Sequence, residues 1–106
     1  MEEAFKKEIV QRITKNLLDI QILRLIKAEP MWGYKIKKQI DAASGVKLGH
    51  GALYPLLNRL EREGFLESQR QKQGKRIRKV YAITQKGKQY IDVYRNILKE
   101  QINNIR

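Results

Sequence analysis

The sequence predicts a mainly α-helical fold that contains one two-stranded β-hairpin, and three observations support this prediction. Over most of the chain, apolar residues recur every three or four positions, which is the period of a helix packed on a core. Between about residues 65 and 83 this period is lost, and the segment Arg78–Ile83 alternates and contains β-forming residues, as a strand does. The chain has 106 residues, of which 42% are hydrophobic, and this suits one domain with one modest core.

The first predicted helix covers residues 4–28. From Leu17 onward its apolar residues become dense, as expected of a segment that is buried on several sides. A break near Thr14 or Asp19 would divide it into two helices, and Pro30 ends it because the residue before a proline avoids helical dihedral angles. The first half has an apolar residue at every fourth position, and these share one face: Phe5, Ile9, Ile13 and Leu17.

The next two predicted helices are short and are joined by a short linker. One runs from Tyr34 to Ala43, where Gly33 could cap its start and Gly45 stops it. The other runs from about Gly49 to Glu63. Its apolar face has the spacing of a helix packed on a core and consists of Leu53, Leu56, Leu57 and Leu60.

The hairpin and a last helix complete the pattern. Strands are predicted at Phe65–Gln71 and Arg78–Ile83, joined by a polar, glycine-containing tip at 72–76. Thr84 is expected to cap the last helix, which runs from about residue 85 to 105. This order of elements is that of a winged helix-turn-helix with an added long C-terminal helix. In that fold the third helix enters the major groove of DNA, and the basic hairpin, or wing, lies along the backbone.

The charge of the chain indicates an anionic partner. Lys and Arg total 23 against 11 Asp and Glu, which gives a formal net charge of +12. Because so much positive charge repels itself in a compact protein, nucleic acid is the first candidate partner. There are two alternatives. The partner could be a membrane surface, or the basic charge could serve only the solubility of the protein. The most apolar stretch, Leu17–Ile26, is too short and too polar to span a bilayer, so we expect a soluble intracellular protein with no membrane contact.

The residue inventory argues against an enzyme. The chain has no cysteine, which excludes disulfides and thiolate metal sites, and His50 is its single histidine. It also lacks a glycine-rich phosphate loop, and acids such as Glu61 and Glu63 lie next to arginines as ordinary surface pairs. We therefore expect no catalytic residue, no metal and no cofactor.

One basic stretch contains no acid at all, since no Asp or Glu occurs between Ser68 and Ile91. Like charges at this density repel one another unless an anion neutralises them, and DNA phosphates do so with a gain from counterion release. A solvated charged hairpin is the alternative, but charge of one sign on a turn beside a helix favours DNA. The basic residues of the stretch are Arg70, Lys72, Lys75, Arg76, Arg78, Lys79, Lys86 and Lys88.

The third predicted helix carries polar residues opposite its leucines. An asparagine can pair with adenine, an arginine with guanine or phosphate, and a tyrosine commonly bonds a phosphate. The alternative for each is an ordinary exposed side chain. The candidates on this face are His50, Tyr54, Asn58 and Arg59.

Three segments of the chain resemble the PadR family of transcriptional regulators. They are MWGYKI at residues 31–36, GALYPLLNRLEREGFL at 51–66 and RKVYAITQKG at 78–87, in the family's order and spacing over about residues 17–90. The second segment is the most specific, because the TQKG part of the third is shared with other winged helices. The resemblance implies a homodimeric DNA-binding regulator, usually a repressor, whose first and last helices form the dimer interface.

Residue by residue, the resemblance implies DNA contacts on the second helix, around Tyr54 on the third helix, and on the wing. One departure is Ala52, where the family usually has Thr. The segment 49–52 therefore offers no hydroxyl, and the family's base preference is not carried over. Together with the residues argued above, the candidate DNA contacts are Tyr34, Lys35, Lys38, His50, Tyr54, Asn58, Arg59, Lys72, Lys75, Arg76 and Arg78.

Apolar stripes on the first and last helices indicate a dimer. They lie beyond what a winged-helix core can cover, so a partner chain is favoured over packing of the two helices within one chain. The dimerisation segments are then about residues 4–16 and 85–105, on either side of a winged helix-turn-helix at about 17–84. The candidate interface consists of Phe5, Ile9, Ile13, Ile91, Tyr94, Leu98, Ile102 and Ile105.

A small aromatic effector is a further partner that the resemblance suggests, since some relatives sense aromatic compounds or drugs near the dimer interface. Trp32, Tyr90 and Tyr94 are the aromatic residues that would line such a site. Packing is the favoured role for aromatic residues at these places, and the sequence shows no separate ligand domain.

The sequence therefore predicts a sequence-specific regulator, most simply a repressor, that binds double-stranded DNA as a homodimer in the cytoplasm of a prokaryote, at the nucleoid. The helix at 49–63 would lie in the major groove and the wing at 70–79 on the backbone. The alternative is an architectural, chromatin-like protein with little sequence preference, which the high net charge keeps open.

Overall fold

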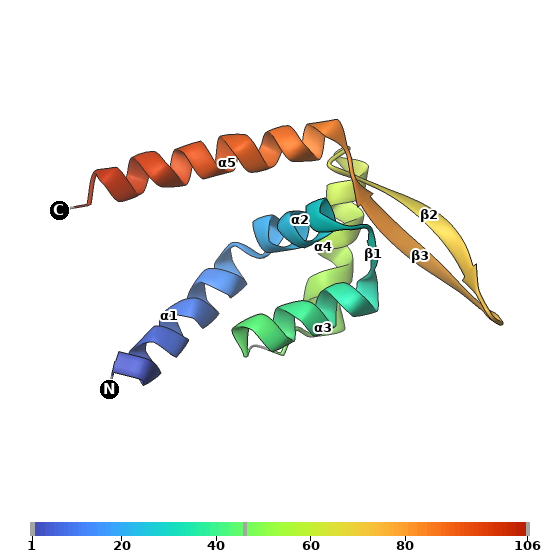
Figure 1. The fold of residues 1–106 in the computed structure, drawn as a ribbon, viewed down its shortest axis with the longest axis horizontal. Coiled ribbons are helices and arrows are strands. Elements are labelled where there is room, and N and C mark those ends of the chain that lie inside the picture. The colour runs from blue at the N-terminus through green and yellow to red at the C-terminus, as the bar shows by residue number, and fades with distance from the viewer. Residues whose placement is uncertain (1, 46, 106) are drawn as a thin grey trace.

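The computed structural model describes residues 2–45 and 47–105, without the side chain of His50. Met1, Arg106 and Val46, which lies in the linker expected between the second and third helices, are outside the described residues. The elements of this part of the chain are, in order, α1 (Glu2–Asn16), α2 (Leu18–Ala28), β1 (Met31–Trp32), α3 (Gly33–Ser44), α4 (His50–Arg62), β2 (Leu66–Gln73), β3 (Arg76–Ile83) and α5 (Gln85–Asn103) (Figure 1).

The first predicted helix is in fact two helices, α1 and α2, which meet at an angle (Figure 1). Leu17, rather than Thr14 or Asp19, interrupts the run, with φ −114° and ψ 38°. Backbone hydrogen bonds still bridge the break, because the Leu17 amide donates to the carbonyl of Ile13 at 2.8 Å. Of the residues of α1, Thr14 alone is buried, so this helix projects from the body of the molecule.

The helix-turn-helix, α3 and α4, matches the prediction within one residue at each end. Gly33 is the first residue of α3 rather than its cap, and Trp32 takes the cap position without a side-chain hydrogen bond. Asp41 fixes the turn between the two helices. Its carboxylate accepts hydrogen bonds from the Leu48 amide at 2.9 Å and from Lys37 Nζ at 2.8 Å.

The described residues form a sheet of three strands, one more than predicted. β1 pairs antiparallel with β3, with Met31 opposite Tyr81 and Trp32 opposite Val80, so the strand order is β1-β3-β2. A strand of two residues is too short to show an alternating pattern, which is why the sequence did not reveal it.

The wing is the long hairpin of β2 and β3. Its register runs from Leu66 opposite Ile83 to Gln73 opposite Arg76, so the loop is shorter than the predicted tip and has only two residues. The loop begins at Gly74, whose φ of 61° is the conformation required at the first position of a type II′ turn. Basic side chains expected in a loose tip are therefore held in strands.

The core lies where α2, α3, α4 and the base of the sheet meet. Three of the four leucines predicted on the inner face of α4 are buried, and Leu56 packs against them partly buried. None of the helices in the described ranges is long and apolar enough to cross a membrane. The most completely buried side chains are those of Ile22, Leu23, Ile26, Ile36, Leu53, Leu57, Leu60 and Leu66.

The long helix α5 is docked through its first half. The Thr84 hydroxyl accepts a hydrogen bond from the Gly87 amide at 3.0 Å, which confirms the predicted cap, and donates one to the Gly64 carbonyl at 2.7 Å. The Tyr90 hydroxyl donates to the Asp19 carboxylate of α2 at 2.7 Å. Burial, together with this hydrogen bond, raises the pKa of Tyr90 to about 12. Both chain ends lie at the end of the molecule opposite the wing (Figure 1).

Candidate nucleic-acid interface

The side of α4 opposite its leucines is open to solvent. Asn58 and Arg59 are exposed, and Tyr54 is half-buried. Arg59 Nε lies 4.0 Å from Glu63 Oε1, at the limit of an ion pair, and the Arg59 side chain remains 54% exposed. Asn58 and Arg59 can therefore reach a ligand from this helix. The side chain of His50, the other candidate here, lies outside the described part of the chain.

Tyr54 lies against the start of α3. A Cβ atom placed on Gly33 would be 2.8 Å from Cε1 of Tyr54 and 3.2 Å from its hydroxyl oxygen, too close for an ordinary contact. Glycine at this position therefore lets the tyrosine ring join α3 to α4. Tyr54, predicted as a DNA contact, also packs against the hydrophobic core.

A groove lies between the start of α3, the exposed side of α4, and β3. It brings together residues of four elements, β1, α3, α4 and β3, and its lining of rings and hydrogen-bonding groups suits a nucleic acid backbone or base edge. Four of the predicted DNA contacts line it: Tyr34, Tyr54, Asn58 and Arg78. The other lining residues are Trp32, Gly33, Lys79 and Tyr81.

The two lysines predicted on α3 differ in their surroundings. Lys35 Nζ is 2.7 Å from Glu29 Oε1, so a neighbouring carboxylate already balances its charge. Lys38 is exposed and forms no ion pair with any acid of the described residues. Its Nζ lies 5.0 Å from the centroid of the Tyr34 ring, which places a positive charge beside the groove.

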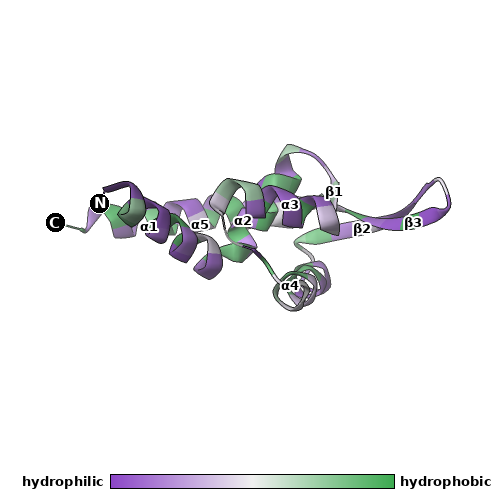
Figure 2. Cartoon of the chain, turned by 90° about the horizontal axis from the view of Figure 1, so that it is seen from below, coloured by the Kyte–Doolittle hydropathy of each residue, from purple (hydrophilic) through white to green (hydrophobic). Residues whose placement is uncertain are grey.

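Apart from Lys79 at its base, the basic residues of the wing form no ion pair with a carboxylate of the described residues. Its basic side chains are exposed, except for Arg78, which is half-buried. Figure 2 shows the hydrophilic colour along most of β2 and β3. Exposed cations of this kind suit the phosphates of a nucleic acid. The residues are Arg70, Lys72, Lys75, Arg76 and Arg78.

The base of the wing is fixed to α4 by an ion pair that the sequence did not indicate. Lys79 Nζ lies 2.8 Å from Glu61 Oε1, and the Ser68 hydroxyl donates a hydrogen bond to the same carboxylate. These two donors hold the pKa of Glu61 below its usual value. Glu61 was expected to form an ordinary pair with an arginine of its own helix, but the hairpin brings Lys79 within reach instead. Lys79 is therefore an anchor of the wing.

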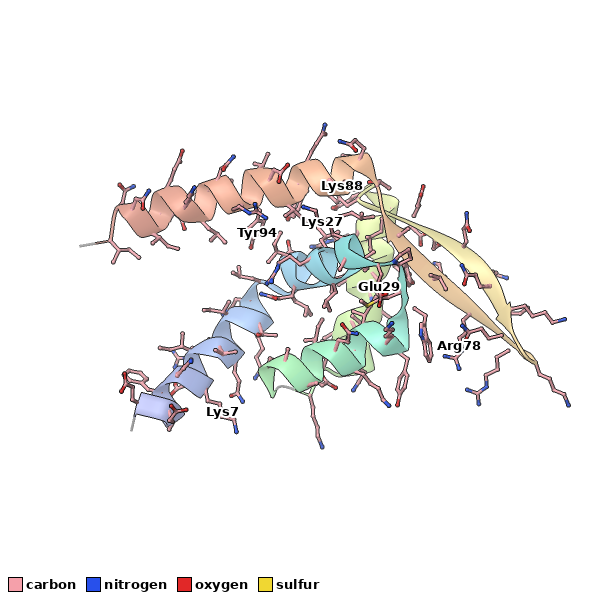
Figure 3. All side chains as sticks on the ribbon, viewed as in Figure 1. Lys7, Lys27, Glu29, Arg78, Lys88 and Tyr94 are labelled. Atoms are coloured by element: carbon pink, nitrogen blue, oxygen red, sulfur yellow. The ribbon has the colours of Figure 1, made fainter. Side chains whose placement is uncertain are left out.

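Arg78 stacks on an aromatic ring. Its Cζ lies 3.4 Å from the centroid of the Trp32 ring, and Figure 3 shows the side chain on the side of the wing that faces α3. The ring of Tyr34 is next to Trp32, with 5.4 Å between centroids. The sequence pointed to Trp32 only as a packing or effector residue. The strand β1, which places it beside β3, was not visible in the sequence pattern.

The side chains predicted to form a dimer interface are mostly open to solvent. Tyr94 and Leu98 line a groove of about 370 Å³ between α1, α2 and α5. Ile91, also predicted at the interface, is only 3% exposed and packs into the core of its own chain at the wall of the same groove. The exposed members are Phe5 (63%), Ile9 (47%), Ile13 (46%), Ile102 (64%) and Ile105 (76%).

Of the three aromatic residues considered for an effector, Tyr90 and Tyr94 are neighbours, but Trp32 lies apart from them. Trp32 lines the groove beside α3, whereas Tyr94 points from α5 into the groove toward α2 (Figure 3). Tyr90 packs between Phe65 and Tyr94, with ring centroids 4.6 Å and 5.8 Å away. Among the described side chains, no group of three or more His, Cys, Asp or Glu is placed to hold a metal ion.

The fold and this surface together define a class of protein. A helix-turn-helix whose second helix is open on one side, followed by a basic wing, is the winged helix-turn-helix architecture of transcription regulators. The model of the Transcriptional regulator PadR-like family matches residues 22–93. The chain belongs to this family, and it is a transcriptional regulator rather than an enzyme.

Solved structures of other proteins share the fold. A PadR-like transcription factor from Bacteroides fragilis is 26% identical, with a TM-score of 0.74 over 93% of this chain and 99% of that chain. A PadR family transcription regulator from Clostridium difficile R20291 is 27% identical, with a TM-score of 0.70 over 80% of this chain and 93% of that chain. Bacillus subtilis PadR in complex with operator DNA is 30% identical, with a TM-score of 0.68 over 74% of this chain and 45% of that chain. No curated protein matches the chain.

Proposed function

We propose that this regulator binds double-stranded DNA sequence-specifically, as a homodimer, and acts as a repressor. The observation that carries the proposal is a set of wing cations that form no ion pair with the carboxylates of the described residues and are exposed, apart from the half-buried Arg78: Arg70, Lys72, Lys75, Arg76 and Arg78. DNA phosphates would neutralise such a strip and release counterions. The similarity to Bacillus subtilis PadR, whose structure contains operator DNA, supports the proposal. A protein with this role acts at the nucleoid in the cytoplasm.

In this proposal α4 lies in the major groove and the wing follows the backbone. Asn58 and Arg59 have the donors and acceptors that distinguish base pairs, since asparagine pairs with adenine and arginine with guanine. Lys72, Lys75 and Arg76 contact phosphates, which gives affinity without sequence information. Specificity and affinity are thereby assigned to two different elements.

The proposal also makes α1 and α5 the dimer interface. Their exposed apolar side chains are more stable when a partner covers them, by roughly 25 cal/mol for each Å² of apolar surface removed from water. Two-fold symmetry then presents two α4 helices to successive major grooves, about 34 Å apart along the DNA.

An Ile102→Asp variant tests the interface. Ile102 is 64% exposed on α5, so the charge should prevent association and give monomers in sedimentation while leaving the fold of one chain intact. Ile77→Asp is the matched control, because Ile77 is 68% exposed on the wing, and it should remain dimeric. A dimeric Ile102→Asp protein would place the interface elsewhere.

Selection of genomic DNA fragments bound by the full chain tests the proposed function. We expect a pseudo-palindromic consensus, bound on the order of a thousandfold more tightly than random duplex at physiological salt. A reporter gene with this sequence in its promoter should lose expression when the protein is produced. Binding without a consensus would support the architectural role that the net charge of +12 keeps open. A failure to bind any duplex would contradict both functions.

A further inference from the structure

The stack between Arg78 and Trp32 follows from the register of the sheet. Trp32 of β1 is opposite Val80 of β3, and Arg78 is two residues before Val80. Residues two apart on a strand share one face, and a diagonal cross-strand neighbour is within reach of long and aromatic side chains. The guanidinium carbon consequently lies 3.4 Å from the centre of the Trp32 ring.

This stack leaves the hydrogen-bonding edge of the guanidinium available. A guanidinium that stacks on a ring uses its flat face, while its N–H donors point outward in the plane of the group. Among the described residues no carboxylate forms an ion pair with Arg78, and its opposite neighbour on β2 is the uncharged Gln71. Lys79, the next residue, is already held by Glu61.

Arg78 therefore differs from the other basic residues of the wing. Arg70, Lys72, Lys75 and Arg76 are exposed, whereas Arg78 is half-buried and lines the groove next to Asn58 of α4. A side chain that is already ordered loses less conformational entropy when it binds, so each of its contacts contributes more affinity.

We propose that Trp32 is a positioning residue for DNA binding. Its ring holds the guanidinium of Arg78 at the groove between β3 and α4, where the free N–H donors bind one backbone phosphate beside the base pairs that α4 contacts. This inference rests on the proposed DNA-binding function and adds to it the residue that orders one phosphate ligand before DNA arrives.

The first test needs no DNA and uses the single tryptophan of the chain. Acrylamide quenching of Trp32 fluorescence is measured in the full-length protein. Arg78→Ala should steepen the quenching slope, because it uncovers one face of the ring. Arg76→Ala, which removes an arginine two residues away on the same strand, should leave the slope unchanged. Equal slopes for the wild type and Arg78→Ala would show that no stack exists in solution and would overturn the proposal.

The second test is a double-mutant cycle on the affinity for a DNA duplex. Trp32→Leu should weaken binding by about fivefold per protomer, the upper range for an exposed cation–π contact. It should have almost no effect in the Arg78→Ala background, because the two residues act through one contact. Trp32→Phe keeps a ring and should restore most of the affinity. The same fivefold weakening in both backgrounds would mean that Trp32 acts without Arg78 and would overturn the proposal.

The salt dependence of binding separates positioning from a general loss of structure. A protein that neutralises one phosphate fewer has a slope of log affinity against log salt that is lower by about 0.9. We expect Trp32→Leu to lower the slope part of the way toward that of Arg78→Ala, whereas an unchanged slope would overturn the proposal. If the wild type bound no duplex, the proposed function would fail, and the quenching experiment would still decide whether the stack exists.

Discussion

The ring of Tyr54 fits against the start of α3 because residue 33 has no side chain. Gly33→Ala would place a Cβ atom 2.8 Å from Tyr54 Cε1, so the ring must move. We expect a loss of about 1 kcal/mol in the free energy of unfolding, as for other overpacked sites. Gly51→Ala is the control, because its Cβ meets nothing within 4 Å, and alanine should stabilise α4 by about 0.5 kcal/mol. Urea denaturation measures both, and a neutral Gly33→Ala would contradict the tight fit.

The pair of Glu61 and Lys79 predicts a dependence of stability on pH. Hydrogen bonds from Lys79 and Ser68 lower the pKa of Glu61 in the folded state below the ordinary value of 4.5. The resulting stabilisation is complete above that ordinary value and is lost as the pH falls through the lower folded pKa. Glu61→Gln should therefore lose less stability than the wild type between about pH 5 and pH 3. Identical pH profiles of the unfolding free energy would show that the pair is absent in solution.

At the scale of elements, the junction between α2 and α5 depends on the hydrogen bond from Tyr90 to Asp19. Tyr90→Phe removes this bond to a charged acceptor while keeping the ring, and we expect a loss of about 1–2 kcal/mol in thermal or chemical unfolding. Tyr94→Phe serves as the control, since the Tyr94 hydroxyl has no hydrogen bond to any described residue, and it should change stability by less than about 0.5 kcal/mol. Equal effects of the two substitutions would argue against this anchor.

A helix was predictable where its repeating pattern of apolar residues extends over several turns. α3, α4 and α5 begin and end within two residues of their predicted bounds, because each carries several turns of one apolar face. A break near Thr14 or Asp19 was considered from the sequence, but its position at Leu17 was not predictable, since no glycine or proline marks it. The strand β1 was missed because Met31 and Trp32 alone form it, and only pairing with β3 defines it.

For the molecule as a whole, the candidate site was predictable where it depends on helix faces and on composition. The side of α4 opposite its leucines and most basic side chains of the wing are open to solvent, as the sequence suggested. Both features follow from the spacing of apolar residues along the helix and from the run of basic residues. The partners of individual cations were not predictable. Lys79 meets Glu61 and Arg78 meets Trp32 only because the fold brings separate segments together. Lys35, predicted as a DNA contact, forms an ion pair with Glu29 for the same reason.

The arrangement separates two functions along the length of the molecule. The wing lies at one end and both chain ends, with α1 and α5, lie at the other (Figure 1). In the proposed dimer, the apolar helices join two chains, and each chain directs its wing and α4 toward DNA. The central claim is that the wing binds phosphates because its cations other than Lys79 form no ion pair with a carboxylate of the described residues.

The salt dependence of DNA binding tests this claim most directly. Affinity for the selected sequence and for random duplex is measured across a range of salt for the wild type, for a Lys75→Ala, Arg76→Ala double variant, and for Asn58→Ala. The wing variant should bind both duplexes more weakly by a similar factor, with a slope lower by about 0.9 for each phosphate that it no longer neutralises. Asn58→Ala should keep the slope and reduce the preference between duplexes. An unchanged slope in the wing variant would contradict the claim.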